Sequence, residues 1–152
     1  MKIRQATIDD IPEICTFLME LTAIGKRRLP SDAAYVRSHY IEHPDAIQCA
    51  VAQVENGDLL GLQILKHASE GNPYGVTTGW GIIGTHVRPS AARRGIGKAL
   101  FAATLTAAKA ADLKKIDATI GSDNQEGLAY YDAIGFRSYK DLGRRVCKCF
   151  DV

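Results

Sequence analysis

Two stretches of this sequence contain residues whose types and spacing could do chemistry, and the first is VRPSAARRGIGKALFAA at residues 87–103. Arg93 and Arg94 lie directly before Gly95 and Gly97, and an alanine-rich run follows without a helix breaker. A helix N-terminus presents unpaired N–H groups and about half a positive charge, and glycines let a ligand approach the backbone closely. The arrangement therefore favours a site for a phosphate or a pyrophosphate.

The spacing of these two glycines is a weak signal by itself. An ordinary turn between a strand and a helix, with a solvated pair of arginines, has the same pattern. The Gly-Lys-Ser/Thr ending of a P-loop is missing, and so are the third glycine and the acidic residue of a Rossmann dinucleotide fingerprint. The stretch excludes these two nucleotide-binding patterns and leaves both other interpretations open.

The second stretch is DNQEGLAYYDAIGF at residues 123–136. Asn124 opens a predicted helix, and Tyr131 follows seven residues later, two turns along the same face. A phenol in this position could protonate a leaving thiolate. The plainer interpretation is that Tyr130 or Tyr131 is half-buried, with its hydroxyl group in water.

The elements that must position these residues form one predicted domain, residues 1–152. Periodicity and turn signals give the order β-α-α-β-β-β-α-β-α-β-β, a mixed α/β fold. The predicted strands cover residues 2–7, 46–54, 59–68, 76–87, 114–121, 136–142 and 144–150. The predicted helices run from Asp9 or Asp10 to Gly25, from Ser31 to before Pro44, from the glycine pair to about Asp112, and from Asp123 through Ile134.

Three local features sharpen this prediction. Asn56-Gly57 indicates a tight antiparallel hairpin, and Gly135 a left-handed helix end with Phe136 as its apolar partner. The glycine-rich stretch 76–87 suggests a bulge or a close approach to the backbone. The helix behind the glycine pair is apolar on nearly all sides, which predicts that it is buried.

Taken together, the two stretches resemble the GCN5-related N-acetyltransferases, the GNAT superfamily. The resemblance rests on Val87, Pro89, the run RGIGKAL at 94–100, and Asn124 followed by Tyr131 and Gly135-Phe136. The opening I-R-x-A-T-x-x-D is also similar, so the resemblance covers essentially the whole chain. It implies a mixed, mostly antiparallel central sheet flanked by about four helices.

The resemblance also implies acetyl-CoA as the cosubstrate and assigns its contacts. The family's pyrophosphate loop corresponds to Arg93, Arg94, Gly95, Ile96, Gly97 and Lys98. The backbone of Thr85, His86 and Val87 corresponds to the strand end that pairs with pantetheine. Asn124 corresponds to the cofactor-side asparagine and Tyr131 to the general acid. Ala92 departs from the glutamine or arginine that the family prefers there, which puts one pyrophosphate contact in doubt.

No general base is identified by the resemblance, because Gly79-Trp80-Gly81-Ile82 contains no counterpart of the glutamate found in many members. An alkyl ammonium with a pKa of about 10 must lose a proton before it attacks a thioester. His86, at the end of the predicted fourth strand, is the first candidate base, and it could equally only pack. Other candidates are His39, His67 and Glu70.

A backbone donor is expected near the reacting atoms, and a cysteine nucleophile is not. A bulge near Gly84 or Thr85 could offer a backbone N–H to the developing oxyanion. Cys15 and Cys49 have no histidine placed to activate them, so direct transfer without an acyl-enzyme is expected.

The acceptor side is the least specified part of the sequence. Lys26, Arg27 and Arg28, between the first two predicted helices, could favour an acceptor with a carboxylate, although a solvated basic loop is the plainer interpretation. Loop 69–75 could form another wall, with Tyr74 and Trp80 as its lining, and Trp80 also fits the core.

These features favour an acetyl-CoA-dependent N-acetyltransferase that acts directly on a primary amine of a small molecule or amino acid. The alternatives are a protein or peptide N-acetyltransferase, a non-catalytic acyl-CoA-binding module and a phosphate-binding interaction domain. Assays of thiol release with an amine panel distinguish these classes.

The composition is that of an ordinary globular domain, with 46% hydrophobic and 24% charged residues and a net charge of +2. This net charge is too small to indicate a nucleic-acid or membrane partner, and no 18-residue apolar run is present, so neither partner is expected. No apolar signal core is present, so the predicted location is cytoplasmic. Cys15, Cys49, Cys147 and Cys149 match no zinc spacing, so no metal is expected. They are interpreted as reduced thiols, with a Cys147/Cys149 redox pair as the alternative; a homodimer through the C-terminal hairpin is possible.

Overall fold

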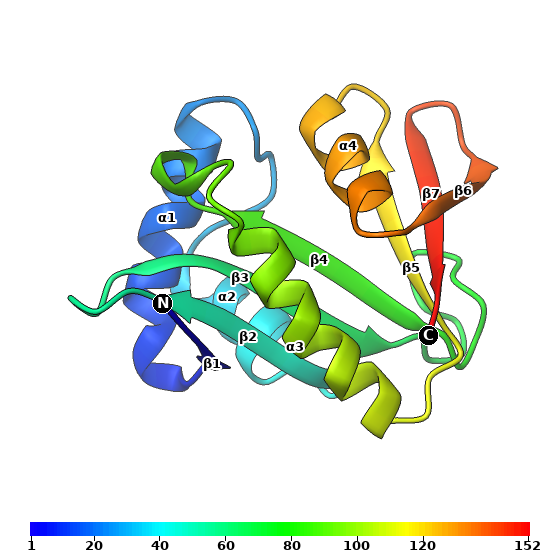
Figure 1. The fold of residues 1–152 in the computed structure, drawn as a ribbon, viewed down its shortest axis with the longest axis horizontal. Coiled ribbons are helices and arrows are strands. Elements are labelled where there is room, and N and C mark those ends of the chain that lie inside the picture. The colour runs from blue at the N-terminus through cyan, green and yellow to red at the C-terminus, as the bar shows by residue number, and fades with distance from the viewer.

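The computed structural model describes residues 1–152 and contains its strands and helices in the predicted order (Figure 1). The strands are β1 (Lys2–Gln5), β2 (Ala46–Gln53), β3 (Leu59–His67), β4 (Gly81–Val87), β5 (Lys115–Gly121), β6 (Arg137–Asp141) and β7 (Arg145–Asp151). The helices are α1 (Ile11–Ala23), α2 (Ala33–Val36), which continues as a π-helical turn over Arg37–Ile41, α3 (Ile96–Ala110) and α4 (Gln125–Ala133). None of the helices combines the length and the apolarity that crossing a bilayer requires.

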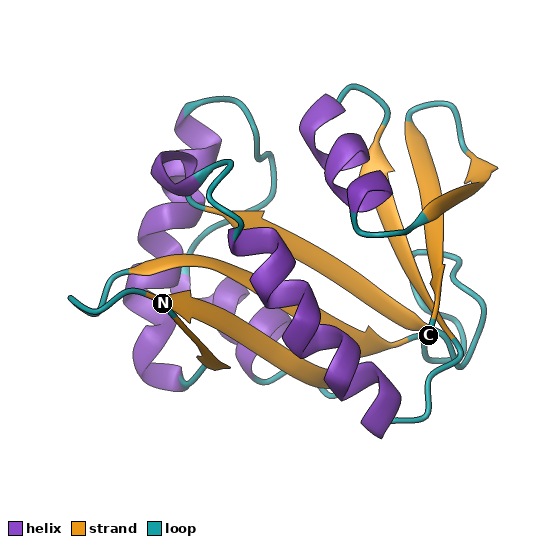
Figure 2. Cartoon of the chain, in the orientation of Figure 1, coloured by secondary structure: helices purple, strands orange, loops and turns teal.

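One seven-stranded sheet forms the centre of the molecule, in the order β1-β2-β3-β4-β5-β7-β6. Every neighbouring pair is antiparallel except β4 and β5, which are parallel. In Figure 2, α3 crosses the near face of the sheet, and α1 and α2 lie behind it. The predicted mixed, mostly antiparallel sheet flanked by four helices is therefore confirmed.

The sheet is split between β4 and β5. The two strands pair only where Gly81 faces Ile116 and Ile82 faces Asp117, and they diverge beyond these positions (Figure 1). Side chains pack closely around this short contact, since a Cβ atom on Gly81 would lie 2.9 Å from a methyl group of Leu113, which precedes β5. From Ile83 onward β4 is paired with β3 alone, and its other edge faces the split.

Apolar side chains pack on both faces of the sheet. Phe17 and Leu18 of α1 are fully buried against β2 and β3, and Leu100 of α3 is fully buried on the opposite face. The helix α3 is buried on one face only, since Ala102 and Thr106 are exposed. The prediction that this helix is buried is confirmed for that face, and the other face is exposed because its alanines supply little apolar surface that must be covered.

One predicted strand boundary and one predicted irregularity also differ from the structure. The strand β4 begins at Gly81 rather than at residue 76, because Asn72 binds the backbone of Val76 in a turn and Gly79 has a φ of +92°. The register of β4 with β3 is continuous, so the expected bulge near Gly84 is absent.

The helix caps are shifted by one residue from the prediction. The side chain of Asp32, not Ser31, accepts the N–H of Tyr35 at the start of α2. The side chain of Asn124, rather than Asp123, caps α4 by accepting the N–H of Gly127 at 3.0 Å. Both residues are good caps, and neighbouring cap residues are not distinguished by sequence alone.

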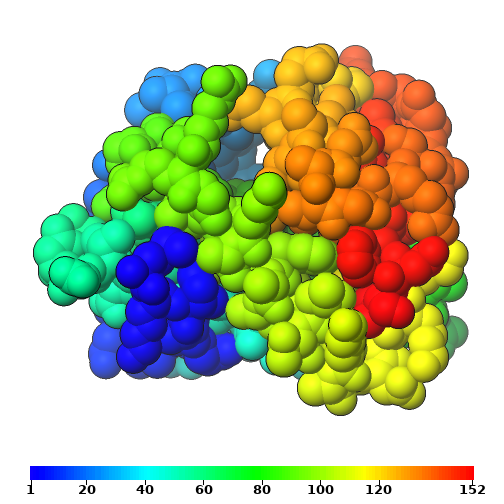
Figure 3. Space-filling model, in the orientation of Figure 1, coloured from blue at the N-terminus to red at the C-terminus, as the bar shows by residue number.

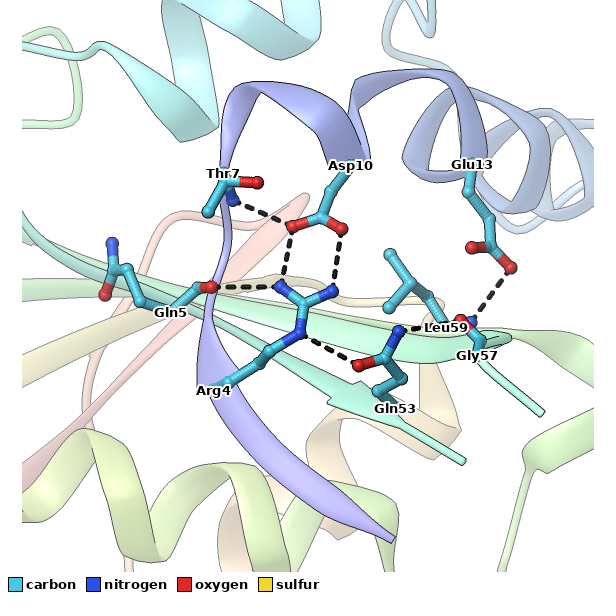
Figure 4. A network of polar contacts seen from close by, with 8 residues as sticks. All are labelled: Arg4, Gln5, Thr7, Asp10, Glu13, Gln53, Gly57 and Leu59. Atoms are coloured by element: carbon cyan, nitrogen blue, oxygen red, sulfur yellow. Dashed lines mark hydrogen bonds and ion pairs between the residues drawn. The ribbon is translucent and has the colours of Figure 1, made fainter. Parts of the chain in front are cut away.

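An ion pair fixes the N-terminal strand to the start of α1 (Figure 4). Arg4 donates to both carboxylate oxygens of Asp10 at 2.8 Å, and Asp10 also accepts the N–H of Thr7 at 2.8 Å. Glu13 accepts the N–H of Leu59 at 2.9 Å and ties α1 to β3. The hydrogen bonds from Arg4 lower the pKa of Asp10.

We predict that Asp10→Asn lowers the free energy of unfolding at pH 7 by about 1.5–3 kcal/mol, because it removes a charge-assisted pair from a buried site. Since the pKa of Asp10 is lowered in the folded state, this stabilisation is present above the unfolded pKa of about 3.9 and is lost as the pH falls through the folded value. Urea unfolding of both proteins at pH 7 and at low pH measures the difference.

The exposed neighbour Asp9 is the matched control. Asp9→Asn is expected to change the free energy of unfolding by no more than about 0.5 kcal/mol. A difference between Asp10→Asn and the wild type that stays constant down to low pH would contradict the assignment.

Candidate active site

The connection between β4 and α3 forms a run of unpaired backbone donors. No hydrogen-bond acceptor contacts the N–H groups of residues 93–98, which are the end of the connection and the first residues of α3. Arg93 and Gly95 have φ angles of +62° and +76°, in the left-handed region. Alternating backbone handedness turns successive N–H groups toward one side and makes a concave anion site.

Charge and space around this run also fit an anion. Arg93, Arg94 and Lys98 are exposed beside it, and the positive end of the α3 dipole points into it. A Cβ atom on Gly95 would meet nothing within 4 Å, so the backbone is open to a ligand there. The residues present therefore fit a pyrophosphate group, as the sequence predicts.

The edge of β4 next to this run can bind an extended chain. Residues of an antiparallel strand alternate between its two edges. Because the N–H of Arg88 donates to Leu60 of β3, the backbone groups of Thr85 and Val87 face the split instead. The alternation of backbone groups between the two edges of β4 therefore leaves N–H and C=O groups free on the side of the split, without a bulge.

Tyr131 of α4 lies against this strand and is almost fully buried. Its hydroxyl group is 2.8 Å from the hydroxyl group of Thr85, and its ring packs edge-on against Phe136. Burial raises the pKa of Tyr131 above its ordinary value. The phenol is therefore protonated at neutral pH and can act only as an acid.

Gln63 of β3 donates to two hydroxyl groups around this phenol. The hydroxyl of Tyr130 donates to the carbonyl of Gly97 at 2.7 Å, so its oxygen can only accept from Gln63. The same amide nitrogen, Nε2, donates to Thr85 at 2.9 Å. The hydrogen of the Thr85 hydroxyl is not used in that bond and is available for the oxygen of Tyr131.

The Thr85 and Tyr131 hydroxyl groups share one hydrogen bond, in which either oxygen can be the donor. When Thr85 donates to Tyr131, the phenol hydrogen is left free for a group in the split. The carbonyl oxygen of Gln63 also has no partner, although Gln63 is completely buried.

Tyr130 also holds the two sides of the split together. A Cβ atom on Gly97 would lie 2.5 Å from the ring of Tyr130, so α3 and α4 touch through a glycine. Figure 3 shows an opening between the connection before α3, in green, and α4, in orange. The split is therefore open to ligands while α3 and α4 remain in contact.

His86 points to the opposite face of β4 from Thr85, because side chains alternate along a strand. Its Nε2 is 3.3 Å from the hydroxyl of Tyr40, which also accepts a hydrogen bond from Arg27. Burial, with a smaller effect of the Arg27 charge, lowers the pKa of His86 to about 3. The imidazole is therefore neutral at physiological pH.

Of the other residues expected on the acceptor side, one lies near His86 and the rest lie elsewhere. His39 stacks on Tyr35, with ring centroids 3.7 Å apart, near His86 and Tyr40. His67 is exposed opposite Gly81, and Glu70 follows it, so both lie at the closed end of the split. Trp80 is half-buried against Tyr139 rather than part of the core.

The connection between α1 and α2 borders the split on the side of His86. Lys26 forms an ion pair with Glu126 of α4 at 2.6 Å. Arg27, which the sequence places in a solvated loop as the plainer interpretation, is only 6% exposed. The connection is therefore solvated at most of its residues but buried at Arg27.

Sequence reasoning missed two buried polar residues near the site. Gln63 interrupts the apolar run LLGLQIL, and Asp117 interrupts KIDATIG. Asp117 is completely buried, accepts hydrogen bonds from Tyr139 and Thr119, and has a raised pKa because of its burial. A lone polar residue inside an apolar strand is the signal that could have identified both.

The sequence and the fold of this chain are similar to those of known proteins. Residues 13–136 match the model of a family described as the acetyltransferase (GNAT) family. A phosphinothricin N-acetyltransferase of Streptomyces coelicolor is 34% identical over 70 residues, which are 44% of this chain. The match covers 41% of that relative, less than half of its length.

Solved structures with the same fold extend over the whole chain. A GCN5-related N-acetyltransferase from Kribbella flavida has a TM-score of 0.81 and 18% identity, and the match covers 99% of this chain and 97% of that one. The yncA protein of Salmonella typhimurium, solved with its cofactor acetyl-CoA, has a TM-score of 0.72 and 16% identity, with 99% and 92% covered. At 16–18% sequence identity, these similarities show that the fold is shared and nothing beyond the fold.

We predict that Gly97→Ala destabilises the protein by about 1–3 kcal/mol, because the new methyl group overlaps the ring of Tyr130. A loss of stability would be informative, because replacing glycine by alanine within a helix ordinarily raises the free energy of unfolding by about 0.5–1 kcal/mol. Urea unfolding measures the change.

The matched control is the same substitution in a Tyr130→Leu background. There the methyl group has space, and Gly97→Ala is expected to be neutral or stabilising. Stabilisation by Gly97→Ala in the wild-type background would show that the two helices do not touch in this way.

Proposed function

Because this chain belongs to the acetyltransferase (GNAT) family, we propose that it transfers the acetyl group of acetyl-CoA directly to a primary amine of a small molecule or amino acid. The run of unpaired N–H groups at residues 93–98, at the open end of the split, carries the proposal. The likeness to a phosphinothricin N-acetyltransferase supports a small-molecule acceptor.

The diphosphate of coenzyme A is assigned to the N–H groups of residues 93–98, with Arg93, Arg94 and Lys98 as counter-charges. Bound acetyl-CoA supplies a thioester whose carbonyl carbon is attacked by an amine and whose thiolate leaves. The free backbone edge at Thr85 and Val87 suits the amide groups of pantetheine. The amide nitrogen of Asn124 remains available on the α4 side, since only its oxygen is used in the cap.

Tyr131 is proposed as the acid that protonates the thiolate. Its burial keeps it protonated, and its hydrogen is free for the thiolate when Thr85 is the donor in the hydrogen bond between the two hydroxyl groups. Thr85 therefore acts as a positioning residue for the phenol. An N–H group on the outer edge of β4 can stabilise negative charge on the acetyl oxygen.

His86 is proposed as the acceptor of the proton that the amine loses. The neutral imidazole has one unprotonated ring nitrogen that can accept a proton, and it lies on the face of β4 opposite Tyr131. Its pKa of about 3 makes it a weak base in the protein alone. A negative charge placed beside Arg27 would raise that pKa, because the Arg27 charge contributes to lowering it.

The direct test measures thiol release from acetyl-CoA with a panel of primary amines, amino acids and short peptides. We expect turnover with small amines or amino acids and not with peptides. Turnover with peptides alone would favour a protein N-acetyltransferase, and binding of coenzyme A without any turnover would favour a binding module. No binding of coenzyme A would refute the assignment.

We predict that Tyr131→Phe lowers kcat by about 100-fold or more and leaves the KM for acetyl-CoA nearly unchanged, because it removes the proton donor and keeps the ring. Steady-state kinetics with both substrates measure the two constants.

Tyr130→Phe is the contrasting variant. It removes the hydrogen bond to Gly97 in the cofactor loop and is expected to raise the KM for acetyl-CoA more than it lowers kcat. Equal losses of kcat and affinity in Tyr131→Phe would count against its role as the acid.

A further inference from the structure

Arg27 is a buried cation without an anionic partner. The other residues from Thr22 to Pro30 are exposed, whereas Arg27 is 6% exposed. Its guanidinium donates to Ser31 Oγ at 3.2 Å, to the Tyr40 hydroxyl at 3.3 Å and to the carbonyl of Pro30 at 2.7 Å. All three acceptors are neutral, and no carboxylate lies within ion-pair distance.

This arrangement is costly unless something else compensates the charge. A buried lysine such as Lys66 can lose its proton, and burial lowers the pKa of Lys66, but an arginine stays charged. The ring of Tyr35, 5.7 Å from the guanidinium carbon, compensates only part of the charge. Of the five N–H groups of Arg27, two have no protein acceptor.

The position of Arg27 connects it with the proposed reaction. A single hydroxyl group, that of Tyr40, lies within 3.3 Å of both Arg27 and His86. The adjacent residue Lys26 is paired with Glu126 of α4, so this segment stands beside the split. A molecule whose amine reaches the split near His86 can therefore place a second group near Arg27.

We propose that Arg27 binds the carboxylate of the acetyl acceptor, so that the acceptor is an amino acid rather than an amine without a carboxylate. This proposal rests on the proposed function, because it assigns the acceptor to the His86 face of the split. A carboxylate matches the fork of N–H groups that a guanidinium presents.

The same pairing would also help the chemistry. The charge of Arg27 contributes to the low pKa of His86, after the larger effect of burial. A carboxylate bound to Arg27 compensates this charge and makes His86 a better proton acceptor. An acceptor with a carboxylate would in this way favour its own deprotonation.

The test compares amino acids, their carboxamides and the corresponding amines without a carboxyl group as acceptors for the full chain. We expect kcat/KM of the wild type to be about 10- to 100-fold higher for an amino acid than for its carboxamide. Arg27→Gln should remove most of this preference by raising the KM for the amino acid, while the KM for acetyl-CoA stays unchanged. Arg28→Gln, an exposed neighbour, is the matched control and should keep the preference.

A second measurement does not depend on the folding of the variant. Carboxylic acids that lack the amino group should inhibit the wild type in competition with the acceptor, and their carboxamides should not. Equal use of amino acids and carboxamides, or no inhibition by the acids, would overturn the role of Arg27 and leave the proposed function intact. Failure of every amine to react would refute the proposed function, and binding of the acids would still test Arg27.

Discussion

The structure depends on the very short contact between β4 and β5. Two paired positions, at Gly81 and Ile82, hold the two halves of the sheet together, and everything beyond them diverges. Gly81 occupies a tightly packed position, because a Cβ atom there would lie 2.9 Å from a methyl group of Leu113 and 3.0 Å from one of Leu65, so these side chains would have to shift. The open edge of β4, the opening beside α4 and the approach to the start of α3 all follow from this divergence. If β4 were paired with β5 along its whole length, the backbone groups on that edge of β4 would not be free to bind an extended ligand.

Adjacent residues of one strand separate the two halves of the proposed chemistry. Thr85 faces α4 and contacts the Tyr131 phenol, and His86 faces the α1–α2 side and contacts Tyr40. Because alternation along β4 fixes these directions, the candidate acid and the candidate base cannot neutralise one another. Burial then shifts both groups toward their uncharged forms, in which a phenol can donate and an imidazole can accept.

The parts of the fold that depend on local sequence were predictable, and the parts that depend on distant partners were not. Element order, the Asn56-Gly57 hairpin and the left-handed Gly135 follow from periodicity and turn chemistry, and each is present. The partners of Gln63 and Arg27 include residues 13 to 67 positions away, so a polar residue within an apolar strand and a basic connection are visible in the sequence, but the contacts that they make are not. The roles of the glycine loop and of Tyr131 came from the family resemblance, and the geometry is consistent with them.

The position of β7 has a consequence for how the chain folds as it is synthesised. The strand lies between β5 and β6, although it is the last of the seven to be made. On the ribosome, β1 to β4 can pair in sequence and bury Phe17 and Leu18 early. By contrast β5 has only its two-residue contact with β4 until β7 emerges, and Phe150 of β7 is needed to cover Phe101 and Phe136. The half that carries Tyr131 therefore becomes rigid last, after the β4 edge and the start of α3 have been synthesised.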